Sequence, residues 1–217
     1  MPLNVVMLGK PASGKGTQAA RLAAARGIPK ISTGDMLRDA ARAGTAIGRK
    51  AKALMDRGEF LDDDNMIAIV RERLSRPDAA GGFILDGFPR TIAQAEALDA
   101  MVHGEPLVIV DLAVPDAELL RRMEERRVCR QCGAIAEPGS HRAACDTCGG
   151  EMMTRADDGD EQVRQHRLEV YGRESRPVLQ YYDGRATFRS IDGAQAPEAV
   201  ARDLAASIDA MVPVRKS

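Results

Sequence analysis

The sequence predicts an α/β fold with a doubly wound parallel sheet, and three observations support this. Four short apolar runs have the length and composition of strands buried on both faces: Leu3–Leu8, Phe83–Leu85, Leu107–Leu112 and Phe188–Ile191. Helical patterns separate these runs, as expected when crossover helices join parallel strands. A glycine-rich loop directly follows the first run. With 217 residues, 44% of them apolar and 29% charged, the chain is long enough for one buried core with inserts.

The first strand leads into a phosphate-binding loop. Residues 9–17 read Gly-Lys-Pro-Ala-Ser-Gly-Lys-Gly-Thr. Glycines let backbone amides close around an anion, and Lys15 adds a point charge to the outer phosphates. The positive end of the helix that we expect from Thr17 to Arg26 strengthens the same field. Most loops of this kind have Ser or Thr directly after the lysine, whereas here Gly16 follows it and Thr17 carries the hydroxyl.

Two stretches interrupt the alternation of strands and helices. Residues 32–61 are helical, small and charged, with no strand of their own, and residues 123–160 are rich in glycine, cysteine and charge. We interpret both as inserts on a core made of residues 1–31, 62–122 and 161–217. The last core element is an amphipathic helix from Pro197 to Val212. Its apolar face is formed by Val200, Leu204, Ile208 and Met211.

All four cysteines lie in the second insert, as Cys129-x2-Cys132 and Cys145-x2-Cys148. Two such pairs predict a tetrahedral site of four thiolates, for which Zn²⁺ is the usual metal and iron a possible substitute. Four protein ligands leave no open position, so we expect a structural metal that replaces the missing core of the insert. Two disulfides are the alternative, and a cytosolic chain disfavours them.

Composition and charge exclude several classes of function. The net charge is −1, so no overall basic field attracts nucleic acid, and the cysteine insert lacks alternating basic and aromatic residues. The N-terminus does not read as a signal peptide, and no apolar stretch approaches the roughly 18 residues of a spanning helix. We therefore expect a cytoplasmic protein that binds neither membrane nor nucleic acid.

Further motifs make the chain similar to a known family. Residues 31–38 read Ile-Ser-Thr-Gly-Asp-Met-Leu-Arg, residues 86–91 read Asp-Gly-Phe-Pro-Arg-Thr, and Arg126–Cys129 and Arg155–Asp158 flank the cysteine insert. Together with the phosphate loop and the four cysteines, these motifs resemble the long-form bacterial adenylate kinases with a zinc-bearing lid, end to end. The resemblance implies the P-loop nucleoside monophosphate kinase fold, with residues 32–61 as the AMP-binding insert and residues 123–160 as the zinc-binding lid.

The resemblance also implies the reaction: reversible transfer of the γ-phosphoryl group from Mg-ATP to AMP, giving two ADP. The attacking AMP oxygen is already anionic, so no general base is required. In-line positioning and charge neutralisation are required, and planar guanidinium groups suit both tasks. The partners would be ATP, AMP and ADP, the cofactors Mg²⁺ and a structural Zn²⁺, and the protein a monomer.

Roles carry over to individual residues by their place in the motifs. Gly14, Lys15, Gly16 and Thr17 would hold the ATP phosphates, Arg122 and Gln195 would contact the ATP base, and Asp86 would hold waters around magnesium. AMP would be bound by Thr33, Arg38, the backbone of Glu59, Phe60 and Leu61, the segment Gly87, Phe88, Pro89 and Arg90, and Gln94, which would read the adenine edge. Lys15, Arg90, Arg126, Arg155 and Arg167 would surround the transferred group. Cys129, Cys132, Cys145 and Cys148 would hold the metal.

The sequence departs from the family pattern at three places, of which one is the short segment between the two cysteine pairs and the other two affect the nucleotide site. Lys10 and Ala12 occupy loop positions where the family usually has a small residue and a glycine, and only glycine takes positive φ freely. The segment from Asp158 to Arg167 is one residue longer than usual, so the transfer-site arginine could be Arg164 or Arg167; the register of Arg167 with the following residues favours it.

Two alternative functions remain open from sequence. A sister kinase for UMP, CMP or GMP would share most of these motifs, although Thr33 and Gln94 favour AMP within the family. A nucleotide-gated zinc protein without catalysis would need no monophosphate pocket, yet the residues of such a pocket are present. In an active kinase we expect both inserts to close over the substrates and exclude water.

Overall fold

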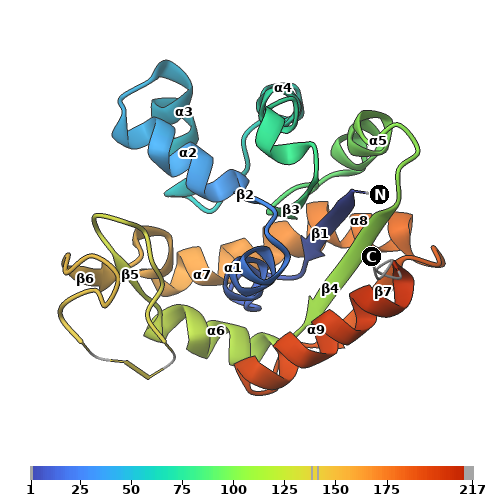
Figure 1. Ribbon diagram of the computed structural model, residues 1–217. Helices are drawn as coiled ribbons and strands as arrows, with labels where there is room; N and C mark the ends of the chain where they lie inside the picture. The colour runs from blue at the N-terminus through green and yellow to red at the C-terminus, as the bar shows by residue number, and fades with distance from the viewer. Residues whose placement is uncertain (1, 138, 141, 213–217) are drawn as a thin grey trace.

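The computed structural model describes residues 2–137, 139–140 and 142–212. A five-stranded parallel sheet with the order β2-β3-β1-β4-β7 forms the core, and a two-stranded antiparallel sheet, β5-β6, lies apart from it (Figure 1). The strands are β1 (Leu3–Leu8), β2 (Lys30–Ser32), β3 (Gly82–Asp86), β4 (Leu107–Ala113), β5 (Arg127–Cys129), β6 (Met152–Thr154) and β7 (Phe188–Asp192). The α-helices are α1 (Lys15–Arg26), α2 (Thr33–Arg42), α3 (Ala46–Met55), α4 (Asp63–Leu74), α5 (Ile92–Met101), α6 (Asp116–Glu125), α7 (Glu161–Val170), α8 (Arg176–Tyr182) and α9 (Pro197–Met211). Short 3₁₀ turns at Pro77–Ala79 and Ala156–Asp158 and one π-helical turn at Tyr171–Ser175 complete them.

The three central strands are buried on both faces, as the apolar runs predict. β1 pairs in parallel with β3 from Leu3 opposite Gly82, and with β4 from Asn4 opposite Leu107. The side chains of successive residues point to opposite faces of the sheet, so continuous burial along a strand requires helices on both sides. The carboxyl ends of all three strands reach the same edge of the sheet, and the functional loops follow there.

The two edge strands correct the sequence analysis. β2 was missed because its three residues include only one that is strongly apolar, Ile31, which a run of apolar residues cannot reveal. β7 is not buried on both faces: Arg189, Ser190 and Asp192 are exposed, and Ile191 alone is fully buried. An edge strand has a neighbour on one side only, so polar residues are tolerated there.

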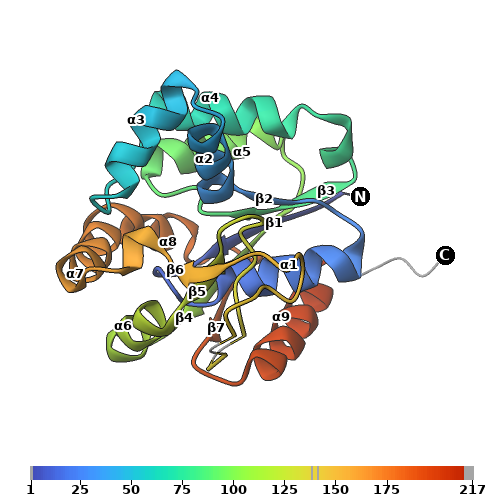
Figure 2. The same ribbon diagram turned by 90° about the vertical axis from the view of Figure 1, so that its left-hand side faces the viewer.

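Helices cover the two faces of the sheet in two separate layers (Figure 2). α1 and α9 cover one face, where Leu22 of α1 packs with Val200, Leu204 and Ile208 of α9, as the predicted apolar face of α9 requires. α4, α5 and α8 cover the other face. Burying an aliphatic side chain of this size contributes about 1.5–3 kcal/mol, so these layers hold the strands and the loops that follow them in place.

The two inserts leave the core at the same side of the molecule (Figure 1). The first, α2 and α3, connects β2 to α4, and the second, with β5 and β6, connects α6 to α7. Leu37 and Ala51 of the first insert belong to the main hydrophobic core, whereas Cys129, Cys145 and Met152 of the second form a cluster of their own. Within the residues that the structure describes, we find no helix with the length and apolarity needed to cross a bilayer.

Candidate functional site

The loop between β1 and α1 has the backbone conformation of an anion cradle. Gly9 and Gly14 have φ values of +132° and +97°. A Cβ atom on Gly9 would lie 2.8 Å from the carbonyl oxygen of Leu112, so the close approach to β4 also requires glycine there. Ala12 has φ +64°, a left-handed conformation that is strained for an L-residue, at the position where the sequence departs from the family pattern.

Lys15, the first residue of α1, lies folded against this loop. Its Nζ donates to the carbonyl oxygens of Gly9 and Lys10, each at 2.7 Å. Burial lowers the pKa of Lys15 to about 8; the carboxylate of Asp86 opposes this effect, and nearby arginines, Arg90 foremost, reinforce it. A lysine in this setting gains a strong preference for an anionic ligand, because a phosphate would restore the stability of its charged form.

Three arginines around the lid share two buried aspartates. Nε of Arg126 donates to Oδ2 of Asp158 at 2.6 Å, Arg155 pairs with Asp157 at 2.6 Å, and Arg167 pairs with both carboxylates. Asp158 is fully buried. Burial, followed by repulsion from Arg155, lowers the pKa of Arg126. Three guanidinium groups against two carboxylates leave a local excess of positive charge.

Two further arginines lie near this group. Nε of Arg90 donates to the carbonyl of Gly87 at 2.8 Å, and its guanidinium carbon lies 4.3 Å from the centre of the Phe60 ring. Arg38, on α2, forms an ion pair with Asp35. Burial lowers the pKa of both arginines; the next cause is repulsion from Arg167 for Arg90 and from Arg155 for Arg38. Such crowding of like charges is costly without an anion between them.

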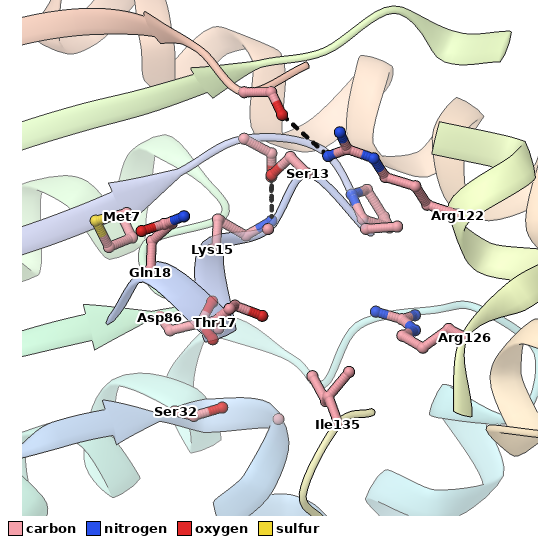
Figure 3. A pocket seen from close by; sticks show the side chains of 18 of the residues that line it. Met7, Ser13, Lys15, Thr17, Gln18, Ser32, Asp86, Arg122, Arg126 and Ile135 are labelled. Carbon is pink, nitrogen blue, oxygen red and sulfur yellow. Dashed lines mark hydrogen bonds between the residues drawn. The ribbon is translucent and has the colours of Figure 1, made fainter. Parts of the chain in front are cut away.

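A single cavity of about 530 Å³ brings these groups together (Figure 3). Of the residues assigned by motif, the following line it: Gly14, Lys15, Gly16, Thr17, Arg38, Glu59, Phe60, Asp86, Gly87, Pro89, Arg90, Arg122, Arg126, Arg155, Arg167 and Gln195. Figure 3 shows Lys15, Thr17 and Asp86 on one side of the opening and Arg122 and Arg126 on the other. The cavity walls come from the core, from α2–α3 and from the lid, so all three parts meet at one place.

One end of the cavity lies between α6 and the loop after β7. Nη1 of Arg122 donates to the carbonyl of Gly193 at 3.0 Å, and its Nε donates to Glu118 at 2.7 Å. Nε2 of Gln195 donates to Asp203 at 3.0 Å. These contacts hold a flat guanidinium group beside a backbone loop, an arrangement that suits a planar base.

Four residues assigned to the substrate do not line the cavity. The side chains of Leu61 and Phe88 belong to the hydrophobic core behind it. Thr33 is 1% exposed and its hydroxyl donates to the carbonyl of Gly87 at 2.9 Å. Gln94 is also 1% exposed, with both ends of its amide hydrogen-bonded inside the protein.

The two candidate arginines on α7 are separated by their positions. Arg167 lines the cavity, whereas Nη1 of Arg164 donates to the backbone carbonyl of Asp158 at 2.7 Å. Arg167, which the register with Leu168 favours, is therefore the one of the two that reaches the cavity.

The cavity also contains residues that the sequence analysis did not assign, among them Glu118, Ile135 and Tyr171. Helical spacing offered a signal for two of them, because Glu118 lies four residues before Arg122 and Tyr171 four residues after Arg167. Ile135 is 44% exposed, the largest exposure among large apolar side chains of the described residues, and it points from the lid into the cavity (Figure 3). No spacing rule identifies such a residue.

The four cysteines form one cluster in the lid. Their Sγ atoms all lie within 4.8 Å of one another, with 3.4 Å between Cys129 and Cys148 and 3.7 Å between Cys132 and Cys145. A tetrahedron of thiolates around Zn²⁺ at about 2.3 Å requires separations of about 3.8 Å, so the donor set fits this metal. Backbone N–H groups, that of Cys132 foremost, lower the pKa of the Cys129 thiol and favour its thiolate, whereas the neighbouring cysteines raise the pKa of Cys132.

The same turn holds each pair of cysteines. The N–H groups of Gly133 and Gly149 donate to the carbonyls of Cys129 and Cys145, at 3.0 Å and 2.8 Å. Both glycines have φ +73°. The cross-pair Sγ distances and these matched turns indicate a preformed four-thiolate site.

Comparison with known proteins agrees with this geometry. A sequence model of the family described as adenylate kinase matches residues 7–187. Adenylate kinase of Archaeoglobus fulgidus is 44% identical over 214 residues, covering 95% of this chain and 98% of that protein. Adenylate kinase of Desulfitobacterium hafniense is 44% identical over 216 residues, covering 96% and 98%. Adenylate kinase of Rhizobium etli is 44% identical over 198 residues, covering 88% and 92%. The chain therefore belongs to the adenylate kinase family, the ATP:AMP phosphotransferases.

Proposed function

We propose that this chain transfers the γ-phosphoryl group between Mg-ATP and AMP in the cavity described above, giving two ADP. One observation carries the proposal: the cations that line a single cavity include the ammonium group of Lys15 and the guanidinium groups of Arg38, Arg90, Arg126, Arg155 and Arg167. Two polyphosphates repel each other, and a ring of fixed cations offsets this repulsion while holding them in line.

The charges act on the transferred group rather than on a proton. The attacking AMP oxygen is anionic, so the residues need only position it and stabilise charge on the equatorial phosphate oxygens. Arg90 and Arg38 would hold the AMP phosphate through planar forks. Lys15, Arg126, Arg155 and Arg167 would close on the phosphates of ATP, with Asp157 and Asp158 holding the lid arginines in place.

The two bases would lie at opposite ends of the cavity. The ATP base would lie against the flat guanidinium group of Arg122, beside the loop that contains Gln195. The AMP base would lie on the side of the α2–α3 insert, near Thr33 and Gln94. Turnover of other nucleoside monophosphates by this chain would test the second assignment.

Asp86 and Thr17 are suited to the water shell of Mg²⁺. Oδ2 of Asp86 lies 3.2 Å from the position that a Cβ atom would take on Gly16. This carboxylate is therefore next to the first turn of α1, which carries the hydroxyl of Thr17. When bound with ATP, the ion would neutralise phosphate charge. The protein residues would orient its waters and keep the cavity closed to bulk water.

The lid cysteines are proposed to hold Zn²⁺ as a structural ion. Four thiolates leave no open coordination position, so the metal would hold the lid as one body and take no part in transfer. We also propose that the protein is cytoplasmic, because its four thiols are unpaired, as expected in a reducing compartment. We further propose that it is a monomer. Light scattering during gel filtration tests the oligomeric state.

An assay with Mg-ATP and a panel of AMP, GMP, UMP and CMP tests the function. We expect ADP to form from AMP, with both substrates consumed equally. Preferred turnover of another monophosphate would replace AMP in the proposal. Binding of ATP with no acceptor-dependent product would favour the nucleotide-gated zinc protein instead.

A further inference from the structure

Gln94 has a defined hydrogen-bond partner at each end of its amide. Its Oε1 accepts from the backbone N–H of Arg90 at 2.8 Å, and its Nε2 donates to Oδ1 of Asp63 at 2.7 Å. The second oxygen of Asp63 accepts from the hydroxyl of Thr91 at 2.9 Å, and that hydroxyl accepts from the N–H of Gln94 at 3.2 Å. Because Gln94 is 1% exposed, these partners take the place of water.

This arrangement fixes which end of the amide carries the oxygen. A glutamine amide can rotate by half a turn, which exchanges donor and acceptor with little change in shape. In Gln94 the reversed orientation would set Nε2 against the N–H of Arg90, donor against donor. It would also set Oε1 against the carboxylate of Asp63, acceptor against acceptor. Both groups would then be buried without a partner, so the observed orientation is locked.

The locked amide keeps a free donor and a free acceptor. An amide nitrogen has two N–H groups and its oxygen two lone pairs, and within the described residues one of each is used. A 6-amino purine offers a donor at position 6 and an acceptor at the neighbouring ring nitrogen, whereas a 6-oxo purine offers the reverse. The orientation of this amide therefore decides which of the two bases it can pair with.

Asp63 lies where it can control this choice. It is the first residue of α4, directly after the α2–α3 insert returns to the core. Through Gln94 it is linked to Arg90, which lines the cavity. We propose that Asp63 is a positioning residue that fixes the orientation of Gln94 and so sets the preference of the acceptor site for 6-amino over 6-oxo purine monophosphates. This rests on the proposed function, in which the acceptor base lies near Gln94, and it requires the insert to move aside from the Arg90 loop so that the base can reach the amide.

The test compares AMP with IMP, which differ only around position 6, in the Asp63→Asn variant. An asparagine can reverse its own amide and pair with either orientation of Gln94, so only the Arg90 restraint remains. We expect the ratio of kcat/KM for AMP to that for IMP to fall about tenfold, through a change in the KM of the monophosphates and with the KM of ATP unchanged. Asp64→Asn, the same change at the exposed next position of α4, is the matched control and should keep the wild-type ratio.

The ratio is measured on one preparation, so a loss of folded protein cancels from it. A wild-type ratio in Asp63→Asn, or an equal fall in Asp64→Asn, would overturn the proposal. Gln94→Ala separates the two levels of the argument: if it leaves the ratio unchanged, the base is read elsewhere and the role of Asp63 falls, while ADP production from AMP still supports the proposed function. If the wild-type protein makes no ADP from AMP, the proposed function fails, and the ratio of AMP to IMP affinities by calorimetry still decides the role of Asp63.

Discussion

The two inserts line the same cavity but are stabilised in different ways. Leu37 and Ala51 of the α2–α3 insert are buried in the main hydrophobic core. Its two helices also touch closely, since a Cβ on Gly48 would lie 2.2 Å from the backbone of Ala40. None of the described residues of the lid belongs to that core: the buried cluster of the lid consists of Met152 and two of the cysteines, with two partly buried alanines against it.

This difference separates the stability of the lid from that of the rest of the protein. A hydrophobic insert shares the cooperative unfolding of the core to which it packs. The Zn²⁺ proposed for the four thiolates would stabilise the lid, because a cluster this small buries too little apolar surface to fold alone. The lid can therefore move as a rigid body relative to the core while it forms one wall of the cavity.

Removal of the metal should have the largest effect, and it should be confined to the lid. Structural zinc contributes about 10–16 kcal/mol of apparent binding energy in small zinc domains, and a lid without it loses that contribution. After chelation we expect loss of hydrogen-exchange protection over residues 127–154, with residues 33–55 still protected. The melting temperature of the lid should fall.

Exchange measured by mass spectrometry, with metal restored as the control, tests this expectation. Equal melting temperatures with and without chelator would contradict the account of the lid, as would loss of protection in both inserts together.

The comparison can be sharpened by truncating one apolar side chain in each insert. Leu37→Ala removes a side chain that is 6% exposed from the main core and should lower the free energy of unfolding by about 2–5 kcal/mol. Met153→Ala, in the lid, removes one that is 39% exposed and should change it by about 0.5 kcal/mol or less. Urea titration measures both. A similar loss in the two variants would show that the inserts are not stabilised differently.

Much of the fold could be predicted because the central strands are continuous apolar runs and the phosphate loop directly follows one of them. Short elements carry less information. β2 has three residues, and its position follows from pairing with β3 rather than from its own pattern. The polar face of β7 likewise reflects its place at the sheet edge, which the sequence of one strand does not reveal.

The site was predicted to a similar degree. Motifs identified the charged groups, and the cavity contains Lys15 and the six arginines that were assigned to it. Motifs could not show that Thr33 and Gln94 are buried and bonded within the protein, because this depends on Gly87 and Asp63, which are distant in sequence. Contacts of long sequence separation are set by packing, and one sequence alone does not report them.

Arginines from the two inserts should fail in different ways when removed. Arg38→Ala removes a cation from the α2–α3 insert and should mainly raise the KM of AMP. Arg126→Ala removes one from the lid and should mainly lower kcat. In each case we expect kcat/KM to fall by about 10² to 10³, as when one preorganised charge-stabilising donor is lost.

Arg90→Ala, a change in neither insert, should give a loss of the same size with an unchanged melting temperature. Steady-state kinetics with each substrate varied in turn measures all three variants. Near-normal turnover in Arg90→Ala would contradict the assignment of the transfer site, and a rise in the KM of AMP for Arg126→Ala would contradict the division between the inserts.

The smallest expected effect separates the ATP side of the cavity from the AMP side by pH. The pKa of Lys15 is lowered to about 8 by burial, so the free protein loses this proton as the pH rises through 8. Bound phosphate raises the pKa, and binding above pH 8 must therefore take up a proton.

The affinity for Mg-ATP should be constant below pH 8 and fall by about tenfold per pH unit above it. The AMP side is held by arginines, and the pKa of Arg90, which burial lowers to about 10, is still well above that of Lys15, so the affinity for AMP should stay constant from about pH 7 to about pH 9. Calorimetry in buffers of different ionisation enthalpy measures the proton uptake directly, and Lys15→Arg should abolish it. A parallel fall in AMP affinity would mean that the charge lost near pH 8 serves both nucleotides rather than one.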